Sequence, residues 1–553
     1  MRRASCAVFA ALLLAASSLA SPAEATPPEP WSDPDPPAPP ERHPLGEDYG
    51  FRGAAEYRAQ SVWVQPVSLN TTTDRNLEYL DQRLRLDGTF DYRDLVKLTA
   101  SADVLESVLW GNNGTLGQDP EPTSGAHVNT NNPNFATPCI VLQGGNPADP
   151  RSYGYGLCPA DPIFVRRVYG DVMTPVGLLR VGRQPFTIGA GVAVNDGDGR
   201  HNRFGVAGKG NSADRVLFAT KPLEAFRPAA LRDRSEDRGL VLALMYDRLV
   251  TGDPQLYGDN LHNWITFVRY LAPSYAWGRD LELRLFHAYR WESDVDTSVH
   301  AVGGRVSSRF GDFYAGMDWA VVLGQTREVS QAFSLLTNDP PVDQTIQQFG
   351  ARAVVRYDRP KWTAYLEADY ASGDSDPSAR SALTQFKFAE DTSVGLLLFK
   401  QVLAFQTGRA AAAGSALLKS LGAASVPVEA VDTHGAFTNA FALFPQADYR
   451  PLPDVLLRGG VLFAWAPAAV NDPIASVQHR DGVRTADQLV NFAGGRPAKY
   501  YGTELDGRVQ WRLYDHFAFD LEGAILFPGA ALADENGDAV RSVLVQGRTT
   551  FFF

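Results

Sequence analysis

The sequence predicts an all-β protein: a transmembrane, antiparallel, up-and-down β-barrel of about 18 strands. Three observations lead to this fold class. They are an export signal, segments in which apolar and polar residues alternate, and connections that alternate between tight turns and long polar loops. Composition alone does not decide, because 44% hydrophobic and 21% charged residues also suit a globular protein. The 49 glycines and 11% aromatic residues favour an all-β fold.

The amino end has the pattern of a secretory signal peptide at residues 1–25. Arg2 and Arg3 precede an apolar run, and the small residues Ala23 and Ala25 predict cleavage after Ala25. No other stretch approaches the roughly 20 apolar residues that a spanning helix needs. Residues 26–50 follow as a proline-rich periplasmic linker, either a simple spacer or a segment that docks to the cell wall or a partner.

Alternation is clearest in residues 501–514. Leu505 and Val509 fall on one face of the predicted strand, whereas Glu504 and Arg508 fall on the other. A soluble sheet seldom carries so many charges opposite an apolar face. The same division recurs at 80–92, 281–292 and 362–370.

Eighteen segments alternate in this way within a predicted barrel domain, 51–553. The predicted strands are 52–66, 77–92, 95–109, 163–176, 178–194, 214–223, 238–250, 262–272, 279–293, 298–311, 313–327, 345–359, 361–374, 439–451, 454–466, 500–514, 516–528 and 540–553. Tight turns such as Arg93-Asp94, Gly311-Asp312, Arg359-Pro360 and Tyr514-Asp515 separate long loops, which predicts short periplasmic turns and long extracellular loops. The closing Phe551 to Phe553 resemble the signal that the barrel-assembly machinery reads.

Charged residues on the inward side are the candidate pore-lining residues. Strand parity assigns Arg83, Arg85, Lys97, Asp103, Arg167, Arg284, Arg305, Arg309, Arg352, Arg356, Glu367, Asp369, Glu504, Asp506, Arg508 and Arg512 to this side. Basic residues outnumber acidic ones in this set, which suits anionic solutes. The alternative is that the charges of such a lumen simply pair with one another.

The long loops carry further candidates. Cys139 and Cys158 lie in the predicted outer loop 110–162, and an extracytoplasmic cysteine pair predicts a disulfide. Acidic clusters occur at Asp196 and Asp198, at Asp374 and Asp376, and at Asp534, Glu535 and Asp538. Oxygen ligands at such spacing suit calcium, but none matches a full calcium loop, and solvated acids are the alternative. We therefore expect no metal site.

The predicted outer loop 375–438 contains an apolar, helical segment, 392–420. A loop exposed to water has no reason to be so apolar. The segment is therefore expected to fold inward as a plug or constriction, or to lie over the mouth of the barrel. The alternative is a small satellite core shared with neighbouring outer loops.

Two regions resemble the alginate-export type of outer-membrane porins. Residues 178–191 (LLRVGRQPFTIGAG) and 213–218 (ADRVLF) resemble two of its successive strands, and 367–376 (EADYASGDSD) is similar to a later strand and acidic loop. The resemblance implies an eighteen-stranded barrel with an arginine-rich lumen that conducts an anionic polysaccharide. It adds Arg180 and Arg183 to the pore-lining residues. Their opposite parity requires a bulge or a position at the periplasmic end of the strand.

These features predict an outer-membrane channel for hydrophilic solutes, anionic ones included, or for an acidic polysaccharide. The alternative is a structural barrel with a plugged pore that anchors an envelope complex. The expected partners are outer-membrane lipid, the barrel-assembly machinery and the solute. A net charge of −12 argues against nucleic acid. No catalytic triad or phosphate loop is recognisable, so no enzyme activity and no cofactor are expected.

Overall fold

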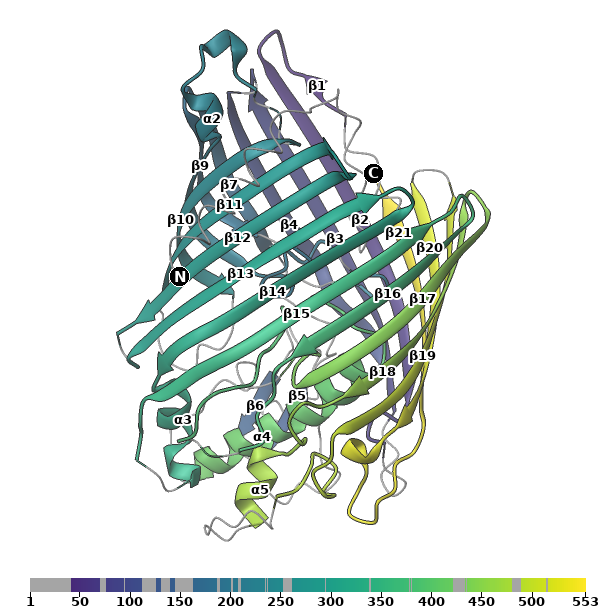
Figure 1. Ribbon diagram of the computed structural model, residues 1–553. Coiled ribbons are helices and arrows are strands. Elements are labelled where there is room, and N and C mark those ends of the chain that lie inside the picture. Colours follow the sequence, from purple (N-terminus) through teal and green to yellow (C-terminus); the bar gives the residue numbers. More distant parts are fainter. Residues whose placement is uncertain are drawn as a thin grey trace.

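The computed structural model of the chain describes most of the residues from 41 onward (Figure 1). The described residues are 41–69, 76–93, 95–111, 126–130, 140–144, 163–185, 189–199, 202–206, 210–233, 235, 237–251, 261–293, 295–337, 340–376, 378, 380–420, 433, 435–479, 489–513 and 516–553. The predicted signal peptide and the predicted disulfide between Cys139 and Cys158 lie outside them.

Eighteen strands form one closed antiparallel barrel, which confirms the predicted fold class. They are β2 (Tyr49–Gln65), β3 (Leu77–Tyr92), β4 (Val96–Gly111), β7 (Ile163–Thr174), β8 (Gly177–Pro185), β9 (Ser212–Thr220), β10 (Gly239–Thr251), β11 (His262–Tyr275), β12 (Gly278–Glu292), β13 (Thr297–Phe310), β14 (Phe313–Thr326), β15 (Gln344–Asp358), β16 (Trp362–Ala371), β17 (Ala440–Leu452), β18 (Val455–Trp465), β19 (Tyr500–Leu513), β20 (Phe517–Pro528) and β21 (Ser542–Phe552). Each strand pairs with its sequence neighbours, and β21 pairs with β2 to close the ring.

A few elements lie outside this ring. They are β1 (His43–Pro44), the hairpin β5 (Ala126–Thr130) and β6 (Ile140–Gly144), the helices α2 (Pro222–Ala225), α3 (Glu328–Thr337), α4 (Ala404–Ser420) and α5 (Pro473–His479), and the short helical turns η3 (Ala229–Leu231), η4 (Leu398–Leu403) and η7 (Ala530–Leu532). β1 falls within the predicted linker 26–50 and pairs with β2, so this part of the linker joins the sheet. Among the described helices, none is both long enough and apolar enough to cross a bilayer.

The two ends of the barrel differ as predicted. At one end the strands are joined mostly by turns of two or three residues, and at the other by longer loops. Helices α3, α4 and α5 gather at the long-loop end, and the carboxy terminus lies at the short-turn end (Figure 1). The connection between β9 and β10 is the exception, because it carries α2 and η3 at the short-turn end.

The predicted strand 178–194 is too long. β8 ends at Pro185, and the chain leaves the barrel wall before Gly189 and Gly191, which adopt positive φ angles of 62° and 78°. Proline removes a backbone donor from the ladder, and two left-handed glycines so close together turn the chain out of the extended conformation. The residues that follow enter the interior instead.

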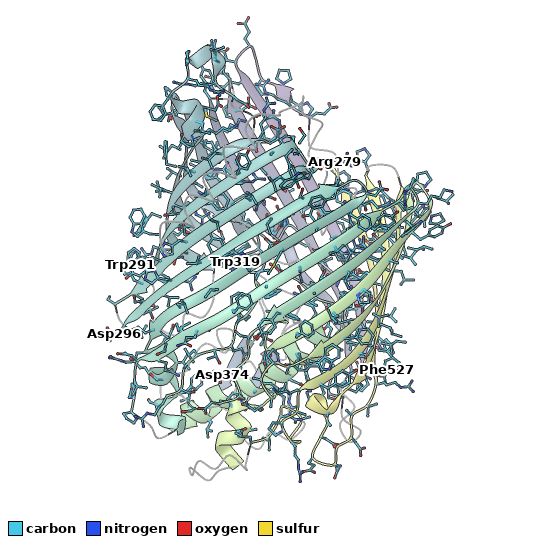
Figure 2. All side chains as sticks on the ribbon, in the orientation of Figure 1. Arg279, Trp291, Asp296, Trp319, Asp374 and Phe527 are labelled. Carbon is cyan, nitrogen blue, oxygen red and sulfur yellow. The ribbon has the colours of Figure 1, made fainter. Side chains whose placement is uncertain are left out.

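The two faces of the wall differ in polarity. Leu505 and Val509 of β19 are 41% and 43% exposed on the outside, whereas Glu504, which immediately precedes Leu505, is fully buried. Figure 2 shows side chains projecting from the outer surface, among them Trp291 and Phe527. An apolar outer face and a closed hydrogen-bonded sheet are what a hydrocarbon environment demands of a β-protein.

Candidate functional site: the barrel interior

The loop between β8 and β9 crosses the interior of the barrel. Strands β8 and β9 lie diametrically opposite β17 and β18 in the strand order, yet Arg203 of this loop reaches them. Its Nε donates to Oε1 of Gln446 at 2.7 Å, and its Nη2 donates to Oδ1 of Asp448 at 2.7 Å. The guanidinium carbon also lies 3.9 Å from the ring centroid of Tyr365. A loop rooted on one wall is therefore fastened to the opposite wall.

The backbone of Arg203 strengthens this fastening. Arg508 donates from Nη1 to the Arg203 carbonyl at 3.0 Å, and Arg458 donates to the same oxygen. The neighbouring Gly205 N–H donates to Oε1 of Glu522 at 2.9 Å. Burial, and then the nearby Arg458 guanidinium, lower the pKa of Arg203 to about 10, so the side chain remains charged at neutral pH.

The other end of this loop is held by arginines on its own side. Asp198 accepts from Nη2 of Arg166 at 2.9 Å and from Nη2 of Arg167 at 3.0 Å. Arg85 lies 3.5 Å from the same carboxylate and forms a further pair with Asp103 at 2.7 Å. Asp198 was a candidate calcium ligand, but arginines occupy its carboxylate. No group of three metal-ligating side chains occurs in the described part of the chain.

A second loop, between β16 and β17, also enters the barrel. The backbone N–H groups of Leu396, Leu397 and Leu398 donate to the Glu504 carboxylate at 2.7, 2.8 and 2.6 Å. Glu504 lies on the inward face of β19, so the loop touches the inside of the wall. Gly395 has a φ of 70°, and a Cβ there would come within 2.8 Å of a Glu504 oxygen.

Apolar packing fixes the same segment. Leu397, Leu398 and Val402 are fully buried in one cluster with side chains from both sides of the barrel seam. The wall contributes Val62 and Val64 of β2, Phe444 of β17, Leu462 of β18, Leu526 of β20 and Leu544 of β21 to this cluster. We refer to residues 392–403 as the inner segment.

The two loops are bound to each other. Asn195 donates from Nδ2 to Oγ1 of Thr392 at 3.0 Å, and Thr392 donates to the carbonyl of Gly191 at 2.6 Å. Asn202 donates to the carbonyl of Asp391 at 2.7 Å and accepts from the N–H of Ser393 at 2.8 Å. The loops therefore form one interlocked unit across the interior.

The predicted apolar segment 392–420 thus divides into two parts. Its inner segment lies inside the barrel, whereas α4 runs to the long-loop end, where Gly414 packs against Ile474 of α5. The inward-folding hypothesis describes the first part, and the satellite-core alternative describes the second.

The structure places most of the predicted pore-lining residues on the inward face. Those that are buried are Arg83, Arg85, Asp103, Arg305, Arg309, Arg352, Glu367, Asp369, Glu504, Asp506 and Arg508, and those that are partly exposed there are Lys97, Arg167, Arg180, Arg284, Arg356 and Arg512. Most of the guanidinium groups bind acids, as Arg352 binds Asp369 at 2.7 Å and Arg305 binds Asp318 at 3.0 Å.

Arg183 was predicted to line the pore, but it lies on the outer face of the wall. It stands directly opposite Val168, which is 43% exposed on the outer face, and its Nε donates to Oδ1 of Asp214 at 2.9 Å. No register shift interrupts β8, so the bulge required to turn Arg183 inward is absent from this described strand. Arg180, three positions earlier, pairs with the inward Asp171 instead.

Sequence reasoning missed several interior residues. The acids Asp318, Asp448, Asp520 and Glu522 and the bases Arg203, Arg215, Arg458 and Arg548 all take part in buried pairs. For those that lie on barrel strands, the alternation of inward and outward side chains along the strand was a sufficient signal. These four acids and four bases add no further excess of basic residues, and mutual pairing accounts for much of the interior charge. Arg203 lies in a loop, where parity gives no signal.

No family model and no curated protein matches this chain. The chain is similar to solved structures at the level of fold. OccAB1 of Acinetobacter baumannii is 9% identical, with a TM-score of 0.49, over 94% of this chain and 99% of that one. OpdK of Pseudomonas aeruginosa with vanillate is 9% identical, with a TM-score of 0.44, over 91% of this chain and 98% of that one. OccK9 (OpdG) of Pseudomonas aeruginosa is 10% identical, with a TM-score of 0.46 over the same shares.

Proposed function

We propose that this protein is an outer-membrane channel for small hydrophilic solutes, narrowed by two interlocked loops. The observation that carries the proposal is the closed eighteen-strand barrel with an apolar outer face and a charged interior. Barrels of this size enclose an aqueous lumen, because their side chains are too short to fill it. The apolar outer face supports a membrane location.

The interlocked loops bear on the size of the solute. Arg203 and Glu504 tie the two loops to the β17–β20 wall, so the loops occupy space that a polymer would need. This arrangement favours a small solute over the acidic polysaccharide that the family resemblance implies. Paired arginines along the wall support polar solutes, including anionic ones that compete with the acids for guanidinium hydrogen bonds.

The alternative is a plugged barrel that anchors an envelope complex. The fully buried apolar cluster of the inner segment favours it, because such packing resembles a permanent core more than a mobile gate. Under this alternative the barrel conducts neither ions nor solutes, even when the loops are loosened.

Liposome swelling tests the proposal against this alternative. Purified full-length protein is reconstituted, and swelling is compared for a neutral sugar and for the corresponding sugar acid. We expect swelling with both solutes and faster entry of the acid. Absence of swelling and of single-channel conductance, in the wild type and in a variant with loosened loops, would contradict the channel and support the anchor.

A further inference from the structure

The outer face of the barrel carries a polar row near the long-loop end of β8–β12. Register places Arg183 opposite Asp214, Asp214 opposite Arg248, Arg248 opposite His262, and His262 opposite Trp291. These side chains share the face of the exposed residue Val216, two positions from Asp214. Figure 2 shows Trp291 projecting from the wall on the same side as Asp296 of a long-loop-end connection. Charged side chains therefore project outward here.

A second row, made of rings, lies next to it, two residues further along each strand toward the middle of the wall. Register aligns Tyr246, Trp264, Tyr289 and His300 across β10–β13. The ring centroids of Tyr246 and Trp264 are 5.1 Å apart, and those of Tyr289 and His300 are 4.7 Å apart. Within the first row the rings of His262 and Trp291 stack with their centroids 5.2 Å apart. The two rows touch, because the rings of Tyr289 and Trp291 stack with their centroids 5.5 Å apart.

Hydrogen bonds orient the imidazole rings. The Tyr246 hydroxyl and Nδ1 of His262 are 2.7 Å apart, and Nε2 of His287 and Nδ1 of His300 are 3.0 Å apart. Stacking and hydrogen bonding together fix these side chains in one arrangement. We refer to Arg183, Asp214, Tyr246, Arg248, His262, Trp264, His287, Tyr289, Trp291 and His300 as the basic rim.

The other side of the barrel differs at the same level. The outward positions of β17–β19 carry Phe441, Trp465 and Tyr500, whose rings pack on one another with centroids 6.1 and 5.7 Å apart. This is the ordinary aromatic girdle of a membrane barrel. The basic rim keeps aromatic rings such as Trp264 and Trp291 and adds arginine and histidine to them, although the chain as a whole has a net charge of −12.

We propose that the basic rim binds the phosphorylated headgroup of a lipid in the outer leaflet. Arg183, Arg248 and the imidazole N–H groups would donate to phosphate oxygens, while Trp264 and Trp291 pack on the apolar part of the same lipid. Arginine forms short charge-assisted hydrogen bonds to phosphate, and aromatic residues favour the headgroup level. Asp214 accepts from Arg183 and so holds that guanidinium in position, and Arg248 stands opposite Asp214 on the next strand. The inference rests on the proposed membrane location.

Lipid retention by the intact protein tests this inference. Full-length protein in detergent is titrated with diphosphorylated lipid A or with its dephosphorylated form, and bound lipid is counted by native mass spectrometry. We expect preferential retention of the phosphorylated lipid. The variant R248Q, which leaves the Arg183–Asp214 pair in place, should weaken it about five-fold, since one arginine near an anionic surface contributes about 1 kcal/mol. H287Q/H300Q should weaken it less.

Controls separate this site from general charge effects. R359Q lies at the short-turn end, where Arg359 pairs with Asp312, and it should retain lipid like the wild type. Millimolar inorganic phosphate should not displace the lipid, because the aromatic contacts are part of the site. Equal retention of the two lipid forms, or equal losses in R248Q and R359Q, would overturn the basic rim as a lipid site. Failure of the protein to insert into vesicles at all would instead contradict the proposed function.

Discussion

The two loops inside the barrel are held by different forces. The β8–β9 loop is fastened by charges at both ends, through Asp198 on its own wall and Arg203 on the opposite wall. The inner segment is fastened by buried leucines and by three backbone N–H groups on Glu504. The difference teaches that one lumen can combine a loop held by ion pairs, which we call the strap, with an inner segment held mainly by apolar burial.

The largest effect is expected from E504A. It removes the acceptor for three backbone N–H groups of the inner segment and leaves them buried without partners. Hydrogen bonds to a charged group contribute about 1.5–3 kcal/mol each, so we expect the inner segment to loosen and conductance to rise several-fold. Single-channel recording measures this. V509A, on the outer face of the same strand, should conduct like the wild type; equal conductance in E504A would show that the inner segment is held by its leucines alone.

R203Q should have the next largest effect. It removes the bonds of this guanidinium to Gln446 and Asp448, while Asp448 keeps Arg458 as its partner. Because that partner remains, we expect a loss of only about 1–3 kcal/mol in thermal unfolding and a smaller rise in conductance than in E504A. R203K retains the charge without the planar guanidinium, so its conductance should lie between those of the wild type and R203Q. A wild-type conductance in R203Q would contradict the strap.

D198N tests the attachment of the β8–β9 loop to the wall on its own side. Neutralising Asp198 weakens its pairs with Arg166 and Arg167 but leaves Arg203 in place on the far wall. We expect an unchanged mean conductance with added current noise, as the loop fluctuates about its remaining attachment. D538N, in an exposed outer loop, is the matched control. Quiet currents in D198N, indistinguishable from those of D538N, would show that the pairs of Asp198 do not order the loop.

The smallest effect is expected outside the lumen, in the β9–β10 connection. Partial burial raises the pKa of Asp233, but hydrogen bonds from Ser235 and Arg238 outweigh this and hold it below the usual value. A lowered pKa stabilises the folded state above the ordinary carboxyl pKa near 4, and this contribution is lost as the pH falls below it. D233N should therefore cost less than about 1 kcal/mol at pH 7 and almost nothing at low pH. Thermal unfolding at both pH values checks this, and an equal loss at both would refute the ion pair.

The wall of the barrel was predictable because side chains alternate with a period of two. That period placed Glu504, Arg352 and Asp369 on the inward face, and it also contradicted the assignment of Arg183, which came from family resemblance. The two tight turns Gly311-Asp312 and Arg359-Pro360 lie where the sequence places them. The alternating pattern and the turn residues, both local in the sequence, were enough to predict these features.

The contents of the lumen were not predictable in the same way. Glu504 meets Leu397 across 107 positions of the chain, and Arg203 meets Asp448 across 245. Neither contact leaves a local pattern, since each depends on closure of the barrel. The apolar character of the inner segment showed that it needs a buried site, but not that the wall of β17–β21 supplies it.

The most direct test of the central claim is the single-channel conductance of the double variant R203Q/E504A. If two fastened loops narrow an aqueous barrel, releasing both should produce a conductance larger than that of either single variant. The protein should still show the gel-mobility shift of a folded barrel. A folded double variant that conducts no better than the wild type would contradict the account.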